Sequence, residues 1–311
     1  MAVNSHKQAI DAAVAAVSTV LLGKSQPIRL ALCCLLARGH LLIEDLPGMG
    51  KTTLAHALAR VLGLSYNRVQ FTSDLLPADI LGVAVYQRED NSFLFHPGPV
   101  FTQVLLADEI NRTTPRTQSA LLEAMAEGQV SIEGETRPLP TPFFVIATQN
   151  PSEQSGTYAL PESQLDRFLM RIELGYPDPG AERDLMRRGD LGGQAASLEQ
   201  VMSVEQLGAI RDQVEAVHTS EALLDYLQRL VARTRAGGDV SVGLSPRGVL
   251  ALLRAAKTWA LMDDRDHVLP EDLQAVLGPV AGHRLVPGER FAGDGMALVA
   301  MLQQDVPVLA S

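Results

Sequence analysis

Residues 41–54 combine a short apolar strand, a glycine-containing loop and the start of a helix. Gly48 and Gly50 allow backbone N–H groups to converge on an anion, and the helix adds unpaired N–H donors and its positive dipole end. Lys51 can then reach nucleotide phosphates as a point charge, and the Thr52 hydroxyl can bind Mg²⁺. The stretch predicts a phosphate-binding loop whose nucleotide-binding residues are Asp45, Pro47, Gly48, Met49, Gly50, Lys51, Thr52 and Thr53.

The loop departs from the usual G-x-x-x-x-G-K-[ST] pattern at its first position, where Asp45 replaces a glycine. Aspartate tolerates a left-handed backbone better than most residues, so we expect the loop geometry to be kept. A carboxylate near phosphates is still unusual. A chance Gly-Lys-Thr at a surface turn is the alternative, but a strand and a helix flank this loop.

Two carboxylates, Asp108 and Glu109, follow the apolar run of residues 104–107. Because open α/β sheets bind ligands at the carboxyl ends of their strands, this pair would face the nucleotide. We expect Asp108 to hold Mg²⁺ through a water and Glu109 to orient or deprotonate the attacking water. The alternative is a strand that ends in an acidic, solvated turn.

Asn150 follows the next apolar strand, which we expect over residues 143–148. Its amide would lie beside Glu109 at the same sheet edge, where it can hydrogen-bond both the γ-phosphate and the attacking water. The Asn-Pro dipeptide also favours a turn by itself, so a turn asparagine before Pro151 is the alternative.

Two arginines could bring further positive charge to a phosphate. Arg247 falls in the first turn of a helix expected over residues 245–262, where the helix dipole disfavours a cation unless an anion compensates it. A phosphate between two domains would do so. The role of Arg167 stays open, because Asp166 or Glu162 could equally pair with it on the surface.

Several other side chains that could bind a ligand are also explained by an ordinary structural role. Arg112 and Arg116 could touch the nucleotide of a neighbouring subunit, but a solvated helix also accounts for them. The 7 histidines show no metal-ligand spacing and are expected at the surface or in packing. Trp259 fits the apolar face of its helix and is expected in the core.

The elements that position the chemistry alternate between strands and helices in the first half of the chain. A strand, the loop, a helix over residues 52–62 and a strand over 66–71 form a β-α-β unit, which predicts a parallel sheet. Two helices are expected before it, over residues 5–22 and 27–38. Two hairpins interrupt the pattern, around residues 88–92 and 133–135.

A linker over residues 176–180 separates two units, 1–178 and 179–311. The first predicts a three-layer α/β nucleotide domain, and the second predicts an all-helical domain with no strand pattern. The nucleotide would lie between them. Amphipathic helices are expected in the second unit over residues 181–189, 203–217, 220–235, 245–262, 270–278 and 294–303.

The composition limits which ligands and which cellular compartment we expect. The net charge of -10 argues against sequence-independent binding of nucleic acid, which needs clustered cations. Cys33 and Cys34 lie inside an apolar run and fit buried hydrophobes, so a reducing cytoplasm is expected. Neither a signal peptide nor a stretch of membrane-spanning length is visible.

Five ordered motifs together resemble the MoxR family of AAA+ ATPases: EDLPGMGKT at residues 44–52, ADEINR at 107–112, ATQNP at 147–151, LDRF at 165–168 and SPR at 245–247. The resemblance covers nearly the whole chain. It implies ATP and Mg²⁺ as ligands, with Thr52 and Asp108 at the metal. It also implies a Walker A loop at Asp45 to Thr52 and Walker B carboxylates at Asp108 and Glu109. The implied sensor-1 residue is Asn150, the arginine finger is Arg167 and the sensor-2 arginine is Arg247.

The same resemblance implies a ring of identical chains, usually a hexamer, with chaperone-like work in metal or cofactor insertion and complex maturation. Such proteins typically act with a von Willebrand factor A domain partner. The alternatives are a magnesium-chelatase-like or gas-vesicle-type motor, a P-loop small-molecule kinase, and a scaffold that binds nucleotide without turnover. Glu109 directly after Asp108 suits water activation rather than a kinase, and intact Lys51 opposes the scaffold. The client and the ring size cannot be read from the sequence.

Overall fold

A computed structural model describes residues 2–89, 91–151, 156–189 and 192–308. Its centre is a five-stranded sheet in the order β2-β5-β8-β1-β9, and every pairing in it is parallel. All five carboxyl ends therefore lie at one edge of the sheet, as the β-α-β pattern predicts. The strands are β1 (Leu41–Glu44), β2 (Tyr66–Gln70), β5 (Val104–Asp108), β8 (Phe144–Gln149) and β9 (Met170–Ile172).

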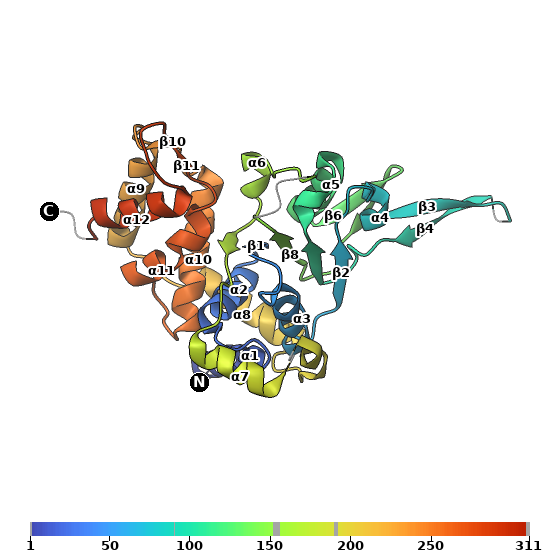
Figure 1. The fold of residues 1–311 in the computed structure, drawn as a ribbon, viewed down its shortest axis with the longest axis horizontal. Helices are drawn as coiled ribbons and strands as arrows, with labels where there is room; N and C mark the ends of the chain where they lie inside the picture. Colours follow the sequence, from blue (N-terminus) through green and yellow to red (C-terminus); the bar gives the residue numbers. More distant parts are fainter. Residues whose placement is uncertain (1, 90, 152–155, 190–191, 309–311) are drawn as a thin grey trace.

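Helices cover both faces of this sheet, which confirms the three-layer α/β fold (Figure 1). Side chains alternate along each strand, so Leu41 and Ile43 join one apolar cluster and Leu42 joins the other. One layer contains α1 (Ala2–Ser18), α2 (Ser25–Leu36) and α3 (Lys51–Val61). The opposite layer contains α4 (Pro77–Leu81) and α5 (Pro115–Glu127), and the short helices η1 (Ile110–Arg112) and α6 (Glu162–Leu165) lie in the connections.

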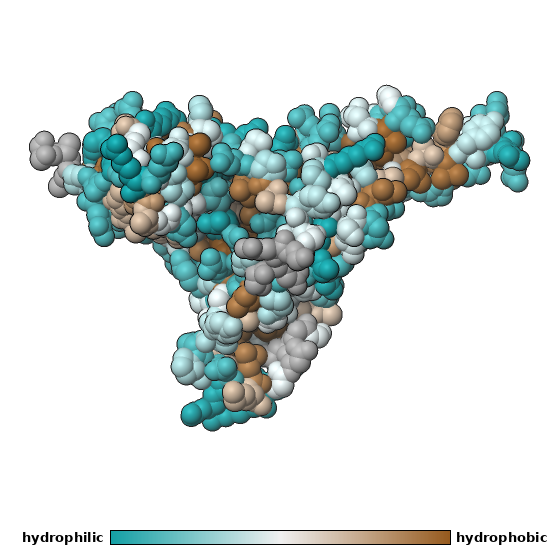
Figure 2. Space-filling model, turned by 45° about the horizontal axis from the view of Figure 1, so that its top comes forward, coloured by the Kyte–Doolittle hydropathy of each residue, from teal (hydrophilic) through white to brown (hydrophobic). Residues whose placement is uncertain are grey.

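Both predicted hairpins are present. The strands β3 (Gly82–Gln87) and β4 (Ser92–Pro97) form an arm that projects away from the body, and β6 (Gln129–Ile132) pairs with β7 (Glu135–Pro138). The arm exposes apolar side chains, with Phe93 64% and Leu94 50% accessible. Figure 2 shows this apolar colour along the arm.

The second unit is mainly helical, as expected, but it is not free of strands. Two short segments, β10 (Val240–Val242) and β11 (Val286–Pro287), pair antiparallel, which corrects the prediction. Strands of two or three residues are too short to show an alternating pattern in the sequence. The helical elements are α7 (Pro179–Arg188), η2 (Gly192–Ser197), α8 (Val204–Ala216), α9 (Glu221–Arg235), α10 (Pro246–Met262), α11 (Pro270–Ala281) and α12 (Gly295–Asp305).

One apolar cluster runs from α1 to α12 and crosses the expected boundary. Arg211 of α8 is buried and donates two hydrogen bonds, of 2.7 and 3.2 Å, to the carbonyl of Leu35 in α2. The boundary near residue 178 therefore stays a prediction, because residues on both sides of it share a core. Within the described residues, no helix is both long and apolar enough to cross a membrane.

Candidate nucleotide site

The predicted phosphate loop follows β1 and leads directly into α3. Gly48 and Gly50 have φ angles of 83° and 96°, in the left-handed region that favours glycine. The backbone thus favours glycine at position 50, where a Cβ would also lie 2.5 Å from Leu21 Cδ1 and force that side chain to shift. Because α3 begins at Lys51, the unpaired N–H groups of its first turn lie next to this turn. These features fit the phosphates of a nucleotide.

Asp45 replaces the usual glycine without bringing its carboxylate into the phosphate turn. One oxygen accepts from the backbone N–H groups of Leu174 and Gly175, both at 2.7 Å, and the other accepts from Leu46 N–H at 2.7 Å. The side chain is only 8% accessible. The carboxylate thus ties the loop to the segment after β9. A pairing across 129 residues leaves no signal in the sequence.

A cavity of about 180 Å³ lies beside the loop. Its walls come from three parts of the chain: the end of α1 with the turn into α2, the phosphate loop, and the linker with α7. The apolar lining suits the flat base of a nucleotide. The lining residues are Val20, Leu21, Leu22, Lys24, Gly48, Met49, Gly50, Thr53, Gly175, Pro177 and Leu185.

The acidic pair lies at the carboxyl end of β5, as predicted. Thr148 on the adjacent strand β8 joins its two members, because its hydroxyl donates to Asp108 Oδ1 at 2.6 Å and accepts from Glu109 N–H at 2.8 Å. Arg68 on β2 donates to Asp108 Oδ2 at 2.7 Å. Neither partner was expected from the sequence, although Thr148 ends a predicted strand and Arg68 lies within another.

Glu109 has an unusual backbone, with φ 58° and ψ 50° in the left-handed region. Its carboxylate oxygen Oε2 accepts from Gln70 at 2.7 Å and from Arg112 at 2.9 Å. Arg112 therefore pairs with the acidic residue of its own chain, whereas Arg116 is exposed in the first turn of α5. These donors restrain the Glu109 carboxylate at the edge of the sheet where the phosphate loop lies.

Asn150 follows β8 and is 4% accessible. Because β8 is the neighbour of both β5 and β1, its carboxyl end lies between the acidic pair and the phosphate loop. A cavity of about 430 Å³ opens here, with Glu44, Gln149 and Asn150 among its lining residues. The fold thus brings the predicted sensor asparagine, the two carboxylates and the loop to one sheet edge.

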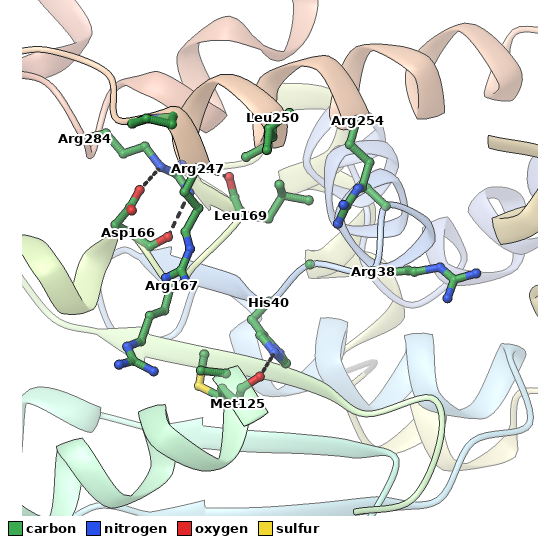
Figure 3. A pocket seen from close by; sticks show the side chains of 15 residues that line it. Arg38, His40, Met125, Asp166, Arg167, Leu169, Arg247, Leu250, Arg254 and Arg284 are labelled. Atoms are coloured by element: carbon green, nitrogen blue, oxygen red, sulfur yellow. Dashed lines mark hydrogen bonds and ion pairs between the residues drawn. The ribbon is translucent and has the colours of Figure 1, made fainter. Parts of the chain in front are cut away.

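Arg167 and Arg247 lie elsewhere, lining one shared cavity of about 510 Å³ (Figure 3). The same cavity is lined by His40, which precedes β1, and by Leu169, which precedes β9. It therefore opens at the amino ends of the strands, whereas the phosphate loop follows the carboxyl end of β1. The 4 residues of β1 alone separate these two ends of the sheet by roughly 13 Å.

This placement corrects the expectation that Arg247 meets a phosphate lying between the two units of its own chain. The physical reason is the position of α10, whose first turn packs beside the segment that leads into β9. Asp166 in that segment accepts from the hydroxyl of Ser245, the residue that caps α10. The two arginines lie together, away from the loop.

The arginine cavity carries a strong excess of positive charge. Asp166, the carboxylate among its lining residues, accepts from Arg284 Nε at 2.7 Å, so it does not pair with Arg167. Arg167 instead donates to the carbonyl of Leu122 at 2.8 Å. Within the described residues, Arg247 has no hydrogen bond or ion pair. The cationic members of the lining are Arg38, Arg167, Arg247, Arg254 and Arg284.

His40 lies in the floor of this cavity and is uncharged at neutral pH. Its Nδ1 accepts from Val145 N–H at 3.0 Å, so the proton resides on Nε2, which lies 3.2 Å from the carbonyl of Met125. Burial lowers the pKa of His40 to about 4. This histidine, like the buried His283, is a packing residue, as expected.

Comparison with known proteins identifies the family. Residues 40–170 match the model described as "ATPase family associated with various cellular activities (AAA)", and residues 232–302 match the AAA lid domain. Chaperone MoxR1 of Mycobacterium tuberculosis is 41% identical over 286 residues, which cover 89% of this chain and 75% of that protein. The chain belongs to the MoxR family of AAA+ ATPases.

Two further chains are similar to this one over most of its length. YeaC of Bacillus subtilis is 44% identical over 283 residues, covering 90% of this chain and 88% of that protein. The crystal structure of a Cytophaga hutchinsonii protein described as an ATPase superposes with a TM-score of 0.89 at 35% identity, covering 98% of this chain and 96% of that one. The MoxR resemblance of the sequence and the AAA+ fold with its lid are thereby confirmed.

Proposed function

We propose that this MoxR-family chain hydrolyses ATP with Mg²⁺ at composite sites, each formed by two neighbouring chains of a ring. The observation that carries the proposal is the separation of the chemical groups within one chain. The phosphate loop, Asp108, Glu109 and Asn150 share the carboxyl edge of the sheet, whereas Arg167 and Arg247 line a cavity at the amino ends. A head-to-tail ring brings one edge of each chain to the opposite edge of the next.

On one side of the composite site, the phosphate loop holds the nucleotide. The N–H groups around Gly48 and Gly50 and the start of α3 bind the phosphates, and Lys51 adds a charge. Thr52 and Asp108 would hold Mg²⁺, which would neutralise charge on the phosphate oxygens. The Thr148 hydroxyl and the Arg68 guanidinium orient the Asp108 carboxylate for this task.

Water activation falls to the acidic residue at the turn after β5. Glu109 accepts the proton of the attacking water, and Asn150 orients that water through its amide. Gln70 and Arg112 hold one carboxylate oxygen, Oε2, and among the described residues Oε1 has no hydrogen-bond partner to hinder contact with a water. The neighbouring chain then supplies Arg167 and Arg247, whose charges stabilise the transition state.

We further propose a hexameric ring that acts as a chaperone-like maturation or metal-insertion factor with a von Willebrand factor A domain protein. The name of the relative Chaperone MoxR1 supports a chaperone role. The exposed apolar arm of β3 and β4 and the β6–β7 turn are the candidate contacts with a client. The net charge of -10 argues against sequence-independent binding of nucleic acid, and a cytoplasmic site of action fits the two free cysteines.

A mixing experiment tests the composite site. Arg167→Ala and Glu109→Gln chains should each release phosphate from ATP at least 100-fold more slowly than the parent. Reassembling the two together should restore activity, because a site that holds ATP on an Arg167→Ala chain regains its arginine from a Glu109→Gln neighbour. Arg290→Ala, which removes an exposed arginine outside the arginine cavity, is the matched control and should keep parental activity.

Ring assembly is followed by light scattering in the same samples. A mixture that assembles but stays as inactive as its components would contradict the composite site. Lys51→Ala should fail to bind ATP, whereas Glu109→Gln should bind it without turnover. Capture of a partner by the ATP-loaded Glu109→Gln ring then tests the von Willebrand factor A domain proposal.

A further inference from the structure

Arg284, just after α11, makes an unusually dense set of contacts with the segment that carries Arg167. Its side chain is 4% accessible. The guanidinium donates to Asp166 Oδ1 at 2.7 Å, to the Asp166 carbonyl at 3.2 Å, to the Phe168 carbonyl at 2.6 Å and to the Leu169 carbonyl at 3.1 Å. It also donates to the carbonyl of Val280 in α11. Arg284 thus holds the chain on both sides of Arg167.

The same carboxylate reaches the helix that carries Arg247. Asp166 Oδ2 lies 3.3 Å from the hydroxyl of Ser245, which caps α10 and accepts from Gly248 N–H at 3.0 Å. Gly248 packs closely on the arginine, since a Cβ there would lie 3.1 Å from Arg284 Cδ. Asp166 therefore connects the loop of Arg167, the first turn of α10 and the end of α11 (Figure 3).

Such a buried charge is a costly way to hold two segments together. Desolvation of an ion takes several kcal/mol of free energy, and well-packed apolar side chains often stabilise a fold equally well. Burial lowers the pKa of Arg284, opposed by its hydrogen bond to Asp166. What the ion pair adds over apolar packing is direction, because a guanidinium with five N–H donors fits only one arrangement of its acceptors.

We propose that Asp166 and Arg284 are positioning residues that hold Arg167 and Arg247 in one fixed arrangement for delivery to the nucleotide of the neighbouring chain. This inference rests on the composite site proposed above. Neither residue needs to touch the nucleotide. Their effect should therefore depend on whether they reside in the chain that supplies the arginines or in the chain that binds ATP.

That asymmetry can be measured in the reassembled mixture. Arg284→Gln is introduced either into the Glu109→Gln chain, which supplies the arginines, or into the Arg167→Ala chain, which binds the ATP. In the supplying chain it should lower the restored kcat at least tenfold and leave the KM for ATP within twofold. In the ATP-binding chain it should change both by less than twofold, because that chain's own arginine is already lost.

The matched control is Arg265→Gln, which removes another arginine of the second unit, paired there with the buried Asp272. It should show no such asymmetry. Asp166→Asn keeps the shape of the side chain and removes its charge, so it should reproduce the asymmetry even where Arg284→Gln prevents assembly. Equal losses in either chain, or no loss in the supplying chain, would overturn the positioning role. An unmodified mixture without activity would instead refute the composite site itself.

Discussion

Replacing Thr148 by valine should uncouple the two carboxylates while preserving the shape of the core. The hydroxyl is fully buried and serves both Asp108 Oδ1 and Glu109 N–H. Valine removes this acceptor, and a buried donor left without a partner costs about 1–3 kcal/mol. We therefore expect the free energy of unfolding to fall by about this amount.

The same bond supports the left-handed backbone of Glu109, a conformation that itself costs an ordinary residue about 1–2 kcal/mol. Without it the turn can relax, and the site must regain the strained form before it reacts. Since about 1.4 kcal/mol corresponds to a factor of ten in rate, this strain of about 1–2 kcal/mol should lower kcat about 5- to 30-fold in Thr148→Val.

The assay is phosphate release under saturating ATP, with ATP affinity measured in parallel by calorimetry. Affinity should stay within about threefold, because the phosphate loop is untouched. Thr148→Ser keeps the hydroxyl and is the matched control, with kcat expected close to the parent. A Thr148→Val protein that is less stable but hydrolyses ATP at the parental rate would refute the view that this hydroxyl positions Glu109.

Two further predictions concern stability and binding. The pKa of His40 is about 4 in the folded chain and near 6.5 in the unfolded chain. Between these values the unfolded chain binds the proton more readily, so the free energy of unfolding is highest above about pH 6.5 and falls as the pH drops toward 4. We expect urea unfolding to show a loss of up to about 3 kcal/mol across that window, smaller in His40→Asn; identical profiles would contradict it. Asp45→Asn should lower the melting temperature, because an acceptor of Leu174 and Gly175 N–H weakens, while ATP affinity stays within about twofold. A clearly tighter ATP complex of this variant in calorimetry would show that the carboxylate repels the phosphates after all.

The parallel pairing of the sheet and its functional edge could be predicted because their signals are local, whereas the strand order could not. Apolar runs that end in polar residues identify β5 and β8, and parallel pairing then places Asp108 and Asn150 at the same edge. The positive φ angles of Gly48 and Gly50 likewise follow from a short motif. In each case, residues close together in the sequence determine the geometry.

The remainder depends on contacts between distant segments. Asp45 accepts hydrogen bonds from residues 174–175, and Arg284 pairs with Asp166 across 118 residues. No spacing or periodicity in the sequence predicts either contact. The role of Arg167 could not be predicted from its neighbours for the same reason. The adjacent carboxylate of Asp166 pairs with the distant Arg284 and not with Arg167. Single-sequence patterns describe elements, whereas the choice of partner among several charges is made by packing.

Arg247 lies in the first turn of a helix, as the sequence predicts, but away from the phosphate loop of its own chain. A cation in the first turn of a helix faces the positive end of the dipole and needs an anion nearby. Within the described residues Arg247 has no ion pair, and the carboxylate of the cavity, Asp166, is already held by Arg284. Of the four further guanidinium groups that line the same cavity, those of Arg38 and Arg284 pair with carboxylates, whereas those of Arg167 and Arg254 have no carboxylate partner among the described residues. The phosphate loop of the same chain lies at the opposite edge of the sheet, away from Arg247. The ATP of a neighbouring chain would supply such an anion, which supports the composite site proposed above.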